Sequence, residues 1–198
     1  MRTGATVVRI GIVAPGRGRT ARAVHLGVTL DGVLDEVFDR VPRPYRTPVW
    51  HRRPEGDHTT LLIPPSVPRR WVATGLVTLL GEALRRRNRH LNEFGRLRLR
   101  LAADHGDVVL RPPYLGGPAV ALAAWLCEAD VLKTALAATP EADQLLIVSD
   151  RFHAALDGGP AFRRVVVPAG GEREIAWLRV SPDAGTRNSG AGGGLAPS

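Results

Sequence analysis

The residues best suited to metal or acid–base chemistry gather around one short polar turn. Asp57 follows Gly56 there, and His51 and His58 lie close by in the sequence. A carboxylate on a loop can ligate a divalent cation, and the two histidines could cluster with it at the turn. An ordinary solvated turn accounts for the same residues more simply, because Gly and Asp are typical turn residues. Both interpretations of Asp57 stay open: a candidate metal ligand and an ordinary turn residue.

Three other motifs lack the partners that their chemistry requires. The run Gly-Arg-Gly-Arg at 16–19 has no Lys-Ser/Thr pair of a phosphate-binding loop. Ser149 has no nucleophile-elbow context, so a hydrolase triad is not supported. His105 has no second His or Cys at ligand spacing, and its neighbour Gly106 favours a turn. None of these motifs predicts an active site.

The composition limits which partners the chain is expected to bind and in which cellular compartment it is expected to lie. The chain carries a net charge of +8, but its densest basic run, 85–89, falls at the end of a predicted helix, where cations complement the helix dipole. Aromatic stacking platforms are absent, so we do not expect nucleic-acid binding. A single cysteine, Cys127, excludes an intrachain disulfide. With no signal peptide and no apolar run of about 18 residues, we expect a cytoplasmic protein that does not enter a membrane.

Hydrophobic spacing predicts three amphipathic helices interleaved with short strands. The helices are expected at 26–41, 70–90 and 119–138, on one side of a sheet. Strands are expected at 7–13, 47–51, 58–63, 96–101, 108–110, 145–148, 163–167 and 174–180, with a turn at 105–107 and a short helix capped by Ser149. This order predicts an α+β fold of the ferredoxin-like kind, with a mixed or antiparallel sheet and helices mainly on one face.

The strand at 96–101 has the clearest pattern. Arg96, Arg98 and Arg100 alternate with leucines, so the arginines share one face and the leucines the other. The arginine face needs water, a carboxylate or an anionic ligand, and we expect it to be solvated or to form an interface. Residues 1–180 are expected to form one domain, and the Gly-, Ser- and Pro-rich segment 181–198 a disordered tail.

Several motifs follow one another between residues 96 and 156: the Arg/Leu strand, a His-Gly-Asp-Val turn, Gly-Gly-Pro-Ala-Val opening a helix, and Leu-Leu-Ile-Val-Ser-Asp. With the element order over about residues 6–180, they resemble the class III adenylyl/guanylyl cyclase homology domain. The variant they resemble is the divergent type of actinobacterial multi-domain regulatory proteins. The resemblance implies two metal-binding aspartates, an Asn and an Arg that hold the ribose and phosphates, and active sites between head-to-tail subunits.

The chain departs from that pattern at most functional positions. The first metal-binding position falls at Gly11, and Asp57 alone matches the second. The Asn position is Ala121 and the Arg position is Trp125. Cyclisation needs both carboxylates to hold two divalent ions, and losing one positioned electrostatic group costs about 10²–10³-fold in rate.

The base-selecting positions that the resemblance implies become Arg53 and Tyr114, which we take as candidate nucleotide-binding residues. We expect a non-catalytic cyclase-like domain, without a cofactor, that acts as a regulatory, interaction or nucleotide-sensing module. A homodimer, a heterodimer with a related chain, or a complex with a regulatory protein is expected. The interface candidates are Arg96, Arg98, Arg100 and Trp125. The alternative is an active or heterodimer-dependent cyclase that converts ATP or GTP with Mg²⁺ or Mn²⁺ held through Asp57.

Overall fold

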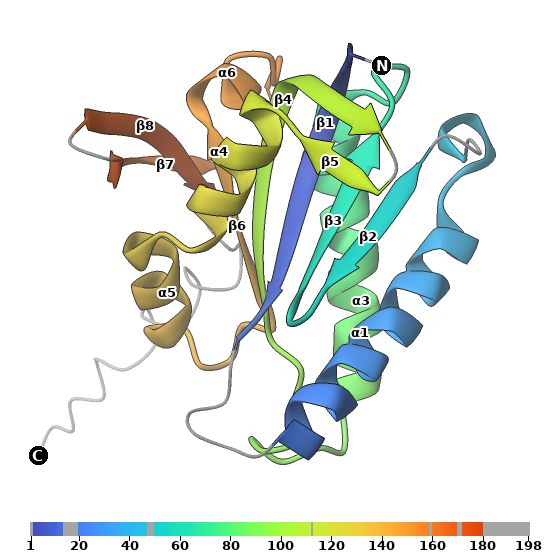
Figure 1. Ribbon diagram of the computed structural model, residues 1–198. Helices are drawn as coiled ribbons and strands as arrows, with labels where there is room; N and C mark the ends of the chain where they lie inside the picture. The colour runs from blue at the N-terminus through green and yellow to red at the C-terminus, as the bar shows by residue number, and fades with distance from the viewer. Residues whose placement is uncertain are drawn as a thin grey trace, which may run out of the picture.

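The computed structural model describes residues 2–13, 20–46, 50–111, 113–158, 160–169 and 172–179. Its strands are β1 (Arg2–Ile12), β2 (His51–Glu55), β3 (His58–Ile63), β4 (Leu99–Arg111), β5 (Tyr114–Gly116), β6 (Gln144–Ser149), β7 (Phe162–Ala169) and β8 (Glu172–Arg179). Its helical segments are α1 (Thr20–Arg40), η1 (Arg43–Tyr45), α2 (Arg69–Trp71), η2 (Val72–Leu76), α3 (Val77–Asn88), α4 (Pro118–Cys127), α5 (Asp130–Ala137) and α6 (Asp150–His153). Figure 1 shows these elements around one central sheet.

The strands form one eight-stranded sheet in the order β2-β3-β1-β4-β6-β8-β7, with β5 paired to β4. β4 and β6 are parallel, whereas the other described pairs are antiparallel. The longest ladder joins β1 to β4. The expected mixed α+β sheet is confirmed.

One face of the sheet is covered by α1 and by the continuous helical segment from α2 through α3. Val8, Ile10 and Ile12 alternate along β1 and are buried in the same core cluster as the apolar residues of these helices. This period of two is the reason that a strand can present a fully apolar face to a helix layer. The helices predicted at 26–41 and 70–90 are confirmed, with α1 beginning earlier, at Thr20.

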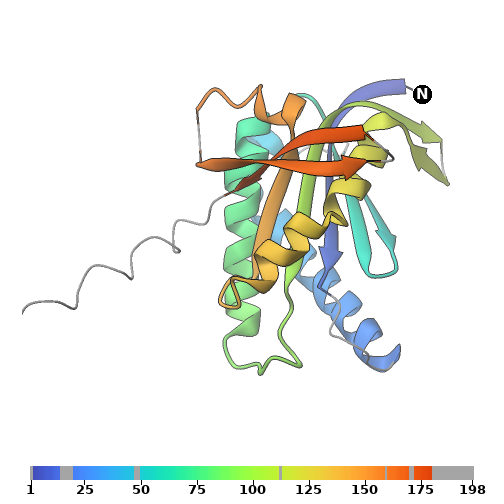
Figure 2. The same ribbon diagram turned by 90° about the vertical axis from the view of Figure 1, so that its left-hand side faces the viewer.

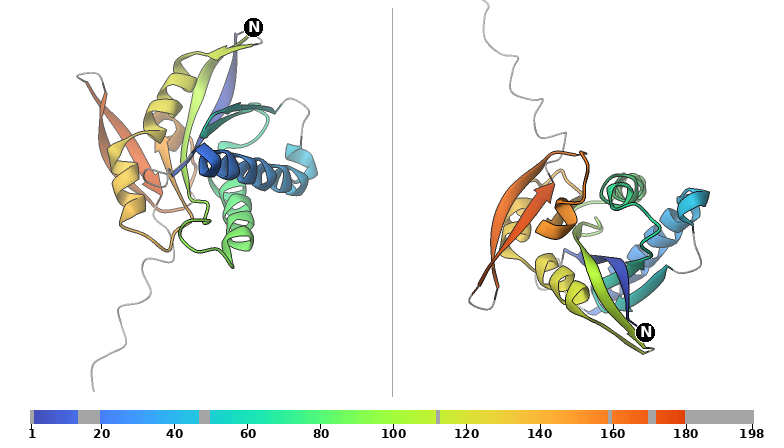
Figure 3. Two further views of the ribbon diagram at one scale, coloured as in Figure 1. Left: turned by 60° about the horizontal axis from the view of Figure 1, so that its bottom comes forward. Right: turned by 90° about the horizontal axis from the view of Figure 1, so that it is seen from above.

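The opposite face carries α4 and α5, which pack against the edge hairpin β7–β8 (Figures 2 and 3). Ala5 and Val7, which alternate with the residues facing α1, pack with Ala119 and Ala123 of α4. The prediction that all three helices share one side is therefore wrong. The central strands are apolar on both faces, so an apolar helix pattern does not tell which face the helix covers.

The predicted helix at 119–138 is two helices. α4 ends at Cys127, and α5 begins at Asp130. Between them, Ala129 has an extended backbone with φ −62° and ψ 133°. The break leaves Glu128 at the C-terminal end of α4, beside the site described below.

The predicted turn at 105–107 is wrong as well, because β4 continues through it. His105 pairs with Thr6, and Gly106 pairs with Ala5, in the ladder with β1. Gly106 instead lets the Arg151 side chain lie close to β4, because a Cβ at position 106 would be 3.3 Å from Cζ of Arg151. Glycine inside a strand often marks such a contact.

The strands predicted at 58–63, 163–167 and 174–180 and the short helix are confirmed, whereas the strand predicted at 47–51 is displaced toward the turn, since β2 runs from His51 to Glu55. Gly56 turns between β2 and β3 with φ 67°, a left-handed conformation that favours glycine. The Ser149 side chain accepts a hydrogen bond from Phe152 N at 3.2 Å and caps α6. Residues 47–49 of the predicted strand, and the predicted domain end at 180 with its tail at 181–198, lie outside the described residues. None of the described helices has both the length and the apolar character that a bilayer span requires.

Candidate functional site

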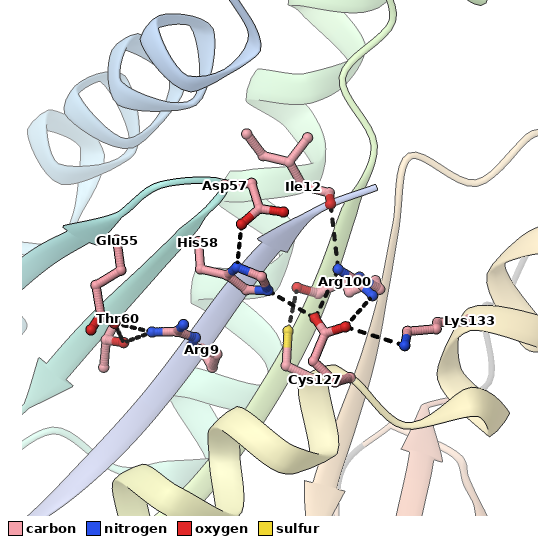
Figure 4. A network of polar contacts seen from close by, with 10 residues as sticks. Arg9, Ile12, Glu55, Asp57, His58, Thr60, Arg100, Cys127 and Lys133 are labelled. Carbon is pink, nitrogen blue, oxygen red and sulfur yellow. Dashed lines mark hydrogen bonds and ion pairs between the residues drawn. The ribbon is translucent and has the colours of Figure 1, made fainter. Parts of the chain in front are cut away.

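The C-terminal end of β1 meets the β2–β3 hairpin, β4 and the last turn of α4 (Figure 4). In the sheet register, Gly11 of β1 lies opposite His58 of β3 on one side and opposite Arg100 of β4 on the other. Directly opposite residues share one face of a sheet. Cys127 reaches the same place from α4. An imidazole, a guanidinium group and a thiol thus surround a glycine.

The imidazole of His58 lies between two carboxylates. Its Nδ1 is 2.7 Å from Asp57 Oδ1, and its Nε2 is 2.8 Å from Glu128 Oε1. The His58 side chain is 15% exposed, whereas those of Asp57 and Glu128 are about half exposed. The Asp57 backbone carbonyl accepts a hydrogen bond from Ile12 N at 2.9 Å. The hairpin tip is therefore tied both to β1 and to the end of α4.

Gly11 has no room for a side chain in this arrangement. A Cβ would lie 3.0 Å from Nε2 of His58 and 3.1 Å from Sγ of Cys127. Both separations are shorter than ordinary van der Waals contact, so a larger residue would displace the imidazole or the sulfur. Burial raises the pKa of Cys127 to about 12, although the positive charge of Arg100 opposes the rise. The thiol is therefore protonated at neutral pH.

Glu128 is the centre of an ion-pair cluster. Arg100 reaches both of its oxygens, with Nη2 at 2.8 Å from Oε1 and Nη1 at 3.0 Å from Oε2. Lys133 Nζ lies 3.2 Å from Oε2. Burial raises the pKa of Glu128, but hydrogen bonds from His58 and Lys133 and the charge of Arg100 outweigh it and lower the pKa overall. Glu128 is therefore an anion in the folded chain.

A second cluster lies one step along the same face. Arg9 donates to Glu55 and, at 2.6 Å, to Thr60 Oγ1, and the Thr60 hydroxyl donates to Glu55 at 3.0 Å. Arg53 Nε lies 3.5 Å from Glu55 Oε1. Burial acts to raise the pKa of Glu55, yet the hydrogen bond and charge of Arg9 lower it overall. The predicted nucleotide-binding residue Arg53 thus belongs to an intrachain pair.

These residues do not fit the pair of divalent ions that cyclisation requires. Such a pair needs two adjacent carboxylates with oxygens free for the metals. Gly11 offers none, and Asp57 is hydrogen-bonded to an imidazole. The other two acids of the clusters, Glu55 and Glu128, are each paired with an arginine.

The remaining predicted positions lie elsewhere on the fold. Ala121 is exposed on α4, and Trp125 is half-buried against the core between α4, α5 and β6. Tyr114 is 58% exposed on β5, which pairs with the last residues of β4. Within the described part of the chain, no hydrogen bond or ion pair joins Tyr114 to Arg53.

The arginine face of the predicted strand is used inside the chain. Arg96 Nε lies 2.7 Å from Asp143 Oδ1, and Arg98 donates to the backbone carbonyls of Leu136, Thr139 and Ala142. Arg100 is 8% exposed and pairs with Glu128. The carboxylates and carbonyls that these guanidinium groups require come from the segment between α5 and β6 and from the end of α4. A role for these arginines in an interface remains a prediction.

No protein-family model matches the sequence, and no curated protein matches it. Solved structures do match. A protein of Silicibacter pomeroyi described as an adenylate/guanylate cyclase/hydrolase has a TM-score of 0.66 at 16% identity, over 91% of this chain and 98% of that one. The guanylyl cyclase Cya2 has a TM-score of 0.62 at 13% identity, over 90% and 92%.

A dimeric guanylyl cyclase domain from the fungus Blastocladiella emersonii has a TM-score of 0.56 at 13% identity, over 91% of this chain and 98% of that one. At such identities the likeness concerns the fold. The chain has the fold of class III adenylyl/guanylyl cyclase catalytic domains, as the sequence resemblance implied.

Sequence reasoning missed two members of the site, Cys127 and Glu128. Cys127 falls within the helix predicted at 119–138, and its side chain is buried. The available signal was a single cysteine followed by an acid near the end of that helix. It gave no indication that His58, distant in the sequence, would meet them.

Proposed function

We propose that this chain is a non-catalytic domain of the nucleotide-cyclase fold that acts as a regulatory or interaction module. The observation that carries the proposal is the environment of Gly11, where the imidazole of His58 and the sulfur of Cys127 fill the space that a metal-binding carboxylate would need. The cyclase-like fold at high coverage supports the comparison of positions.

The positions implied for transition-state stabilisation support the same conclusion. Ala121 has no polar side-chain atom, and Trp125 has one donor and no charge. Neither replaces an amide or a guanidinium group that holds ribose and phosphate. Each such loss costs about 10²–10³-fold in rate, and the losses at Gly11, Ala121 and Trp125 together leave no self-sufficient cyclase.

The first test is an assay for cyclic nucleotides. Purified chain is incubated with ATP or GTP and with Mg²⁺ or Mn²⁺, next to a heat-inactivated sample and the Asp57→Ala variant. We expect the wild type and the variant to give no more product than the inactivated sample. Product from the wild type that disappears in Asp57→Ala would contradict the proposal and favour the active or heterodimer-dependent cyclase.

A second measurement separates an interaction role from nucleotide sensing. Arg53 is already paired with Glu55, so we expect calorimetry with ATP or GTP plus Mn²⁺ to show no saturable binding. Saturable binding that weakens in Arg53→Ala but not in the matched Arg87→Ala, an exposed arginine of α3, would instead assign the sensing role.

A further inference from the structure

The imidazole of His58 faces a carboxylate on each side. Nδ1 faces Asp57 at 2.7 Å, and Nε2 faces Glu128 at 2.8 Å, so both ring nitrogens point at carboxylate oxygens. A neutral imidazole donates from only one nitrogen and would leave its other lone pair facing an acceptor. A metal ion between Nε2 and Glu128 would give the second nitrogen a partner.

A sulfur donor lies at the same place. Ligand atoms of His58, Cys127 and Glu128 all lie within 4.8 Å of one another. Both His58 Nε2 and Cys127 Sγ lie close to Gly11, at 3.0 and 3.1 Å from the position that a Cβ would take there, so the two donors approach each other beside a residue that has no side chain. Zinc binding would draw the donors to the roughly 2.0–2.3 Å of zinc–nitrogen and zinc–sulfur bonds.

We propose that His58 Nε2, Cys127 Sγ and Glu128 Oε1 bind one zinc ion. A set of one nitrogen, one sulfur and one oxygen ligand suits Zn²⁺ better than Mg²⁺ or Ca²⁺, which prefer oxygen alone. The half-exposed Glu128 leaves a fourth position open to water. The inference does not depend on the proposed function, because these ligands are not the carboxylates of nucleotide cyclisation.

Asp57 completes the arrangement as a hydrogen-bond partner of the ligand. A histidine that binds zinc through one ring nitrogen commonly donates its other N–H to a carboxylate, which fixes the tautomer and the ring orientation. The contact from Asp57 Oδ1 to His58 Nδ1, with Nε2 turned toward the thiol and Glu128, has this form (Figure 4).

The cations around Glu128 are compatible with a metal on one oxygen. Lys133 contacts Oε2, and Arg100 has one donor on that oxygen. When zinc binds, Oε1 of Glu128 ligates the metal and gives up its contacts with His58 Nε2 and with Arg100 Nη2. Zinc replaces the thiol proton of Cys127, which leaves to solvent, and the thiolate that forms offsets part of the charge of the entering ion.

Cobalt absorption tests the site directly. The full chain is freed of metal with a chelator and titrated with Co²⁺, which reports thiolate ligation by a sulfur-to-cobalt charge-transfer band. We expect the band to saturate at one Co²⁺ per chain and to disappear when Zn²⁺ is added. The melting temperature should rise with Zn²⁺, because binding to the folded state alone stabilises it.

Variants identify the ligands. Cys127→Ser should abolish the charge-transfer band, and His58→Gln and Glu128→Gln should weaken Co²⁺ binding more than Asp57→Asn, for which we expect about 10–100-fold. His51→Gln, at an exposed histidine on β2, is the matched control and should bind as the wild type does. Circular dichroism checks that each variant is folded, and Asp57→Asn leaves all three ligands in place.

Absence of the band in the folded wild type would overturn the proposal and leave a hydrogen bond between His58 and Glu128 as the explanation. Unchanged binding in folded His58→Gln and Cys127→Ser would overturn it too, as adventitious metal binding. These readouts involve no nucleotide, so a cyclase activity found in the product assay would refute the proposed function without bearing on zinc.

Discussion

The buried carboxylate of Asp104 shows how single polar residues are accommodated inside this sheet. Asp104 lies on β4 with no exposed surface and accepts hydrogen bonds from Ser149 Oγ at 2.6 Å and from Arg151 Nε at 2.7 Å. A buried charge is tolerated only when it is paired and hydrogen-bonded. The hydrogen bond from Arg151 to Asp104 also raises the pKa of the arginine, although burial opposes the rise.

Its neighbour His105 gives a prediction about pH. Burial lowers the pKa of His105 from 6.5, the charges of Arg69 and Arg151 lower it further, and Asp104 opposes them. The unfolded chain therefore binds a proton at higher pH than the folded chain does. Stability from this residue is complete above pH 6.5 and is lost as the pH falls toward the folded value.

We expect the free energy of unfolding to decrease below pH 6.5, at no more than the one-proton limit of about 1.4 kcal/mol per pH unit. His105→Gln should flatten this part of the curve, whereas His90→Gln, at an exposed position, should not. Urea unfolding over a pH series measures both. Equal pH dependence in wild type and His105→Gln would show that other groups cause the loss.

At the scale of elements, the junction between α3 and β4 depends on one buried amide. Asn88 ends α3, accepts a hydrogen bond from Leu97 N at 2.9 Å, and donates to Leu97 O and Asp143 Oδ1, both at 2.8 Å. Arg96 reaches the same Asp143. The end of a helix, the approach to β4 and the loop before β6 are thereby fixed together.

Asn88→Ala should reduce the free energy of unfolding by about 1–3 kcal/mol, because it leaves buried backbone groups of Leu97 without a partner. Denaturant unfolding measures the change, and the dependence of the unfolding free energy on denaturant concentration should be the same in wild type and variant. The control is Arg87→Ala, one residue earlier in α3 and exposed. Arginine and alanine have similar helix propensities, so this change should alter the free energy of unfolding by well under 1 kcal/mol. Similar losses in both variants would mean that the helix end, rather than the amide, is responsible.

At the scale of the whole molecule, the open prediction is association. Trp125 lies half-buried on α4, on the face of the sheet that carries the site residues. Tryptophan and arginine are enriched among residues that dominate binding energy at interfaces. Arg98, in contrast, donates to three carbonyls of its own chain, so a charge reversal there would disturb the fold before it reported on an interface.

We therefore expect a dimer in sedimentation at micromolar concentration, and at least a tenfold weaker dimer, about 1.4 kcal/mol, for Trp125→Ala. The matched control is Val28→Ala, at a residue 66% exposed on α1, which covers the other face of the sheet. A monomeric wild type at high micromolar concentration, or equal association of wild type and Trp125→Ala, would refute the prediction.

The sequence by itself determined the mixed sheet, most of its strands and helices, and the residue types at the positions that the family resemblance implies. The leucines of the alternating strand and the apolar run at 145–148 are buried as predicted, because side-chain direction repeats with the period of the backbone, whereas the burial of Arg100 was not visible in the pattern. Gly11, Ala121 and Trp125 are visible as departures because an absent functional group is evident from the residue type alone.

Only the tertiary structure decided which face α4 covers and what surrounds Gly11. His58 and Glu128 are separated by 70 positions and meet through the register of β1 with β3 and the packing of α4 on the sheet. Local periodicity fixes which side of an element is apolar, but strands buried on both faces accept a helix on either one. The contact of His58 with Cys127 and Glu128 therefore follows from layer packing and strand register, which no short stretch of sequence contains.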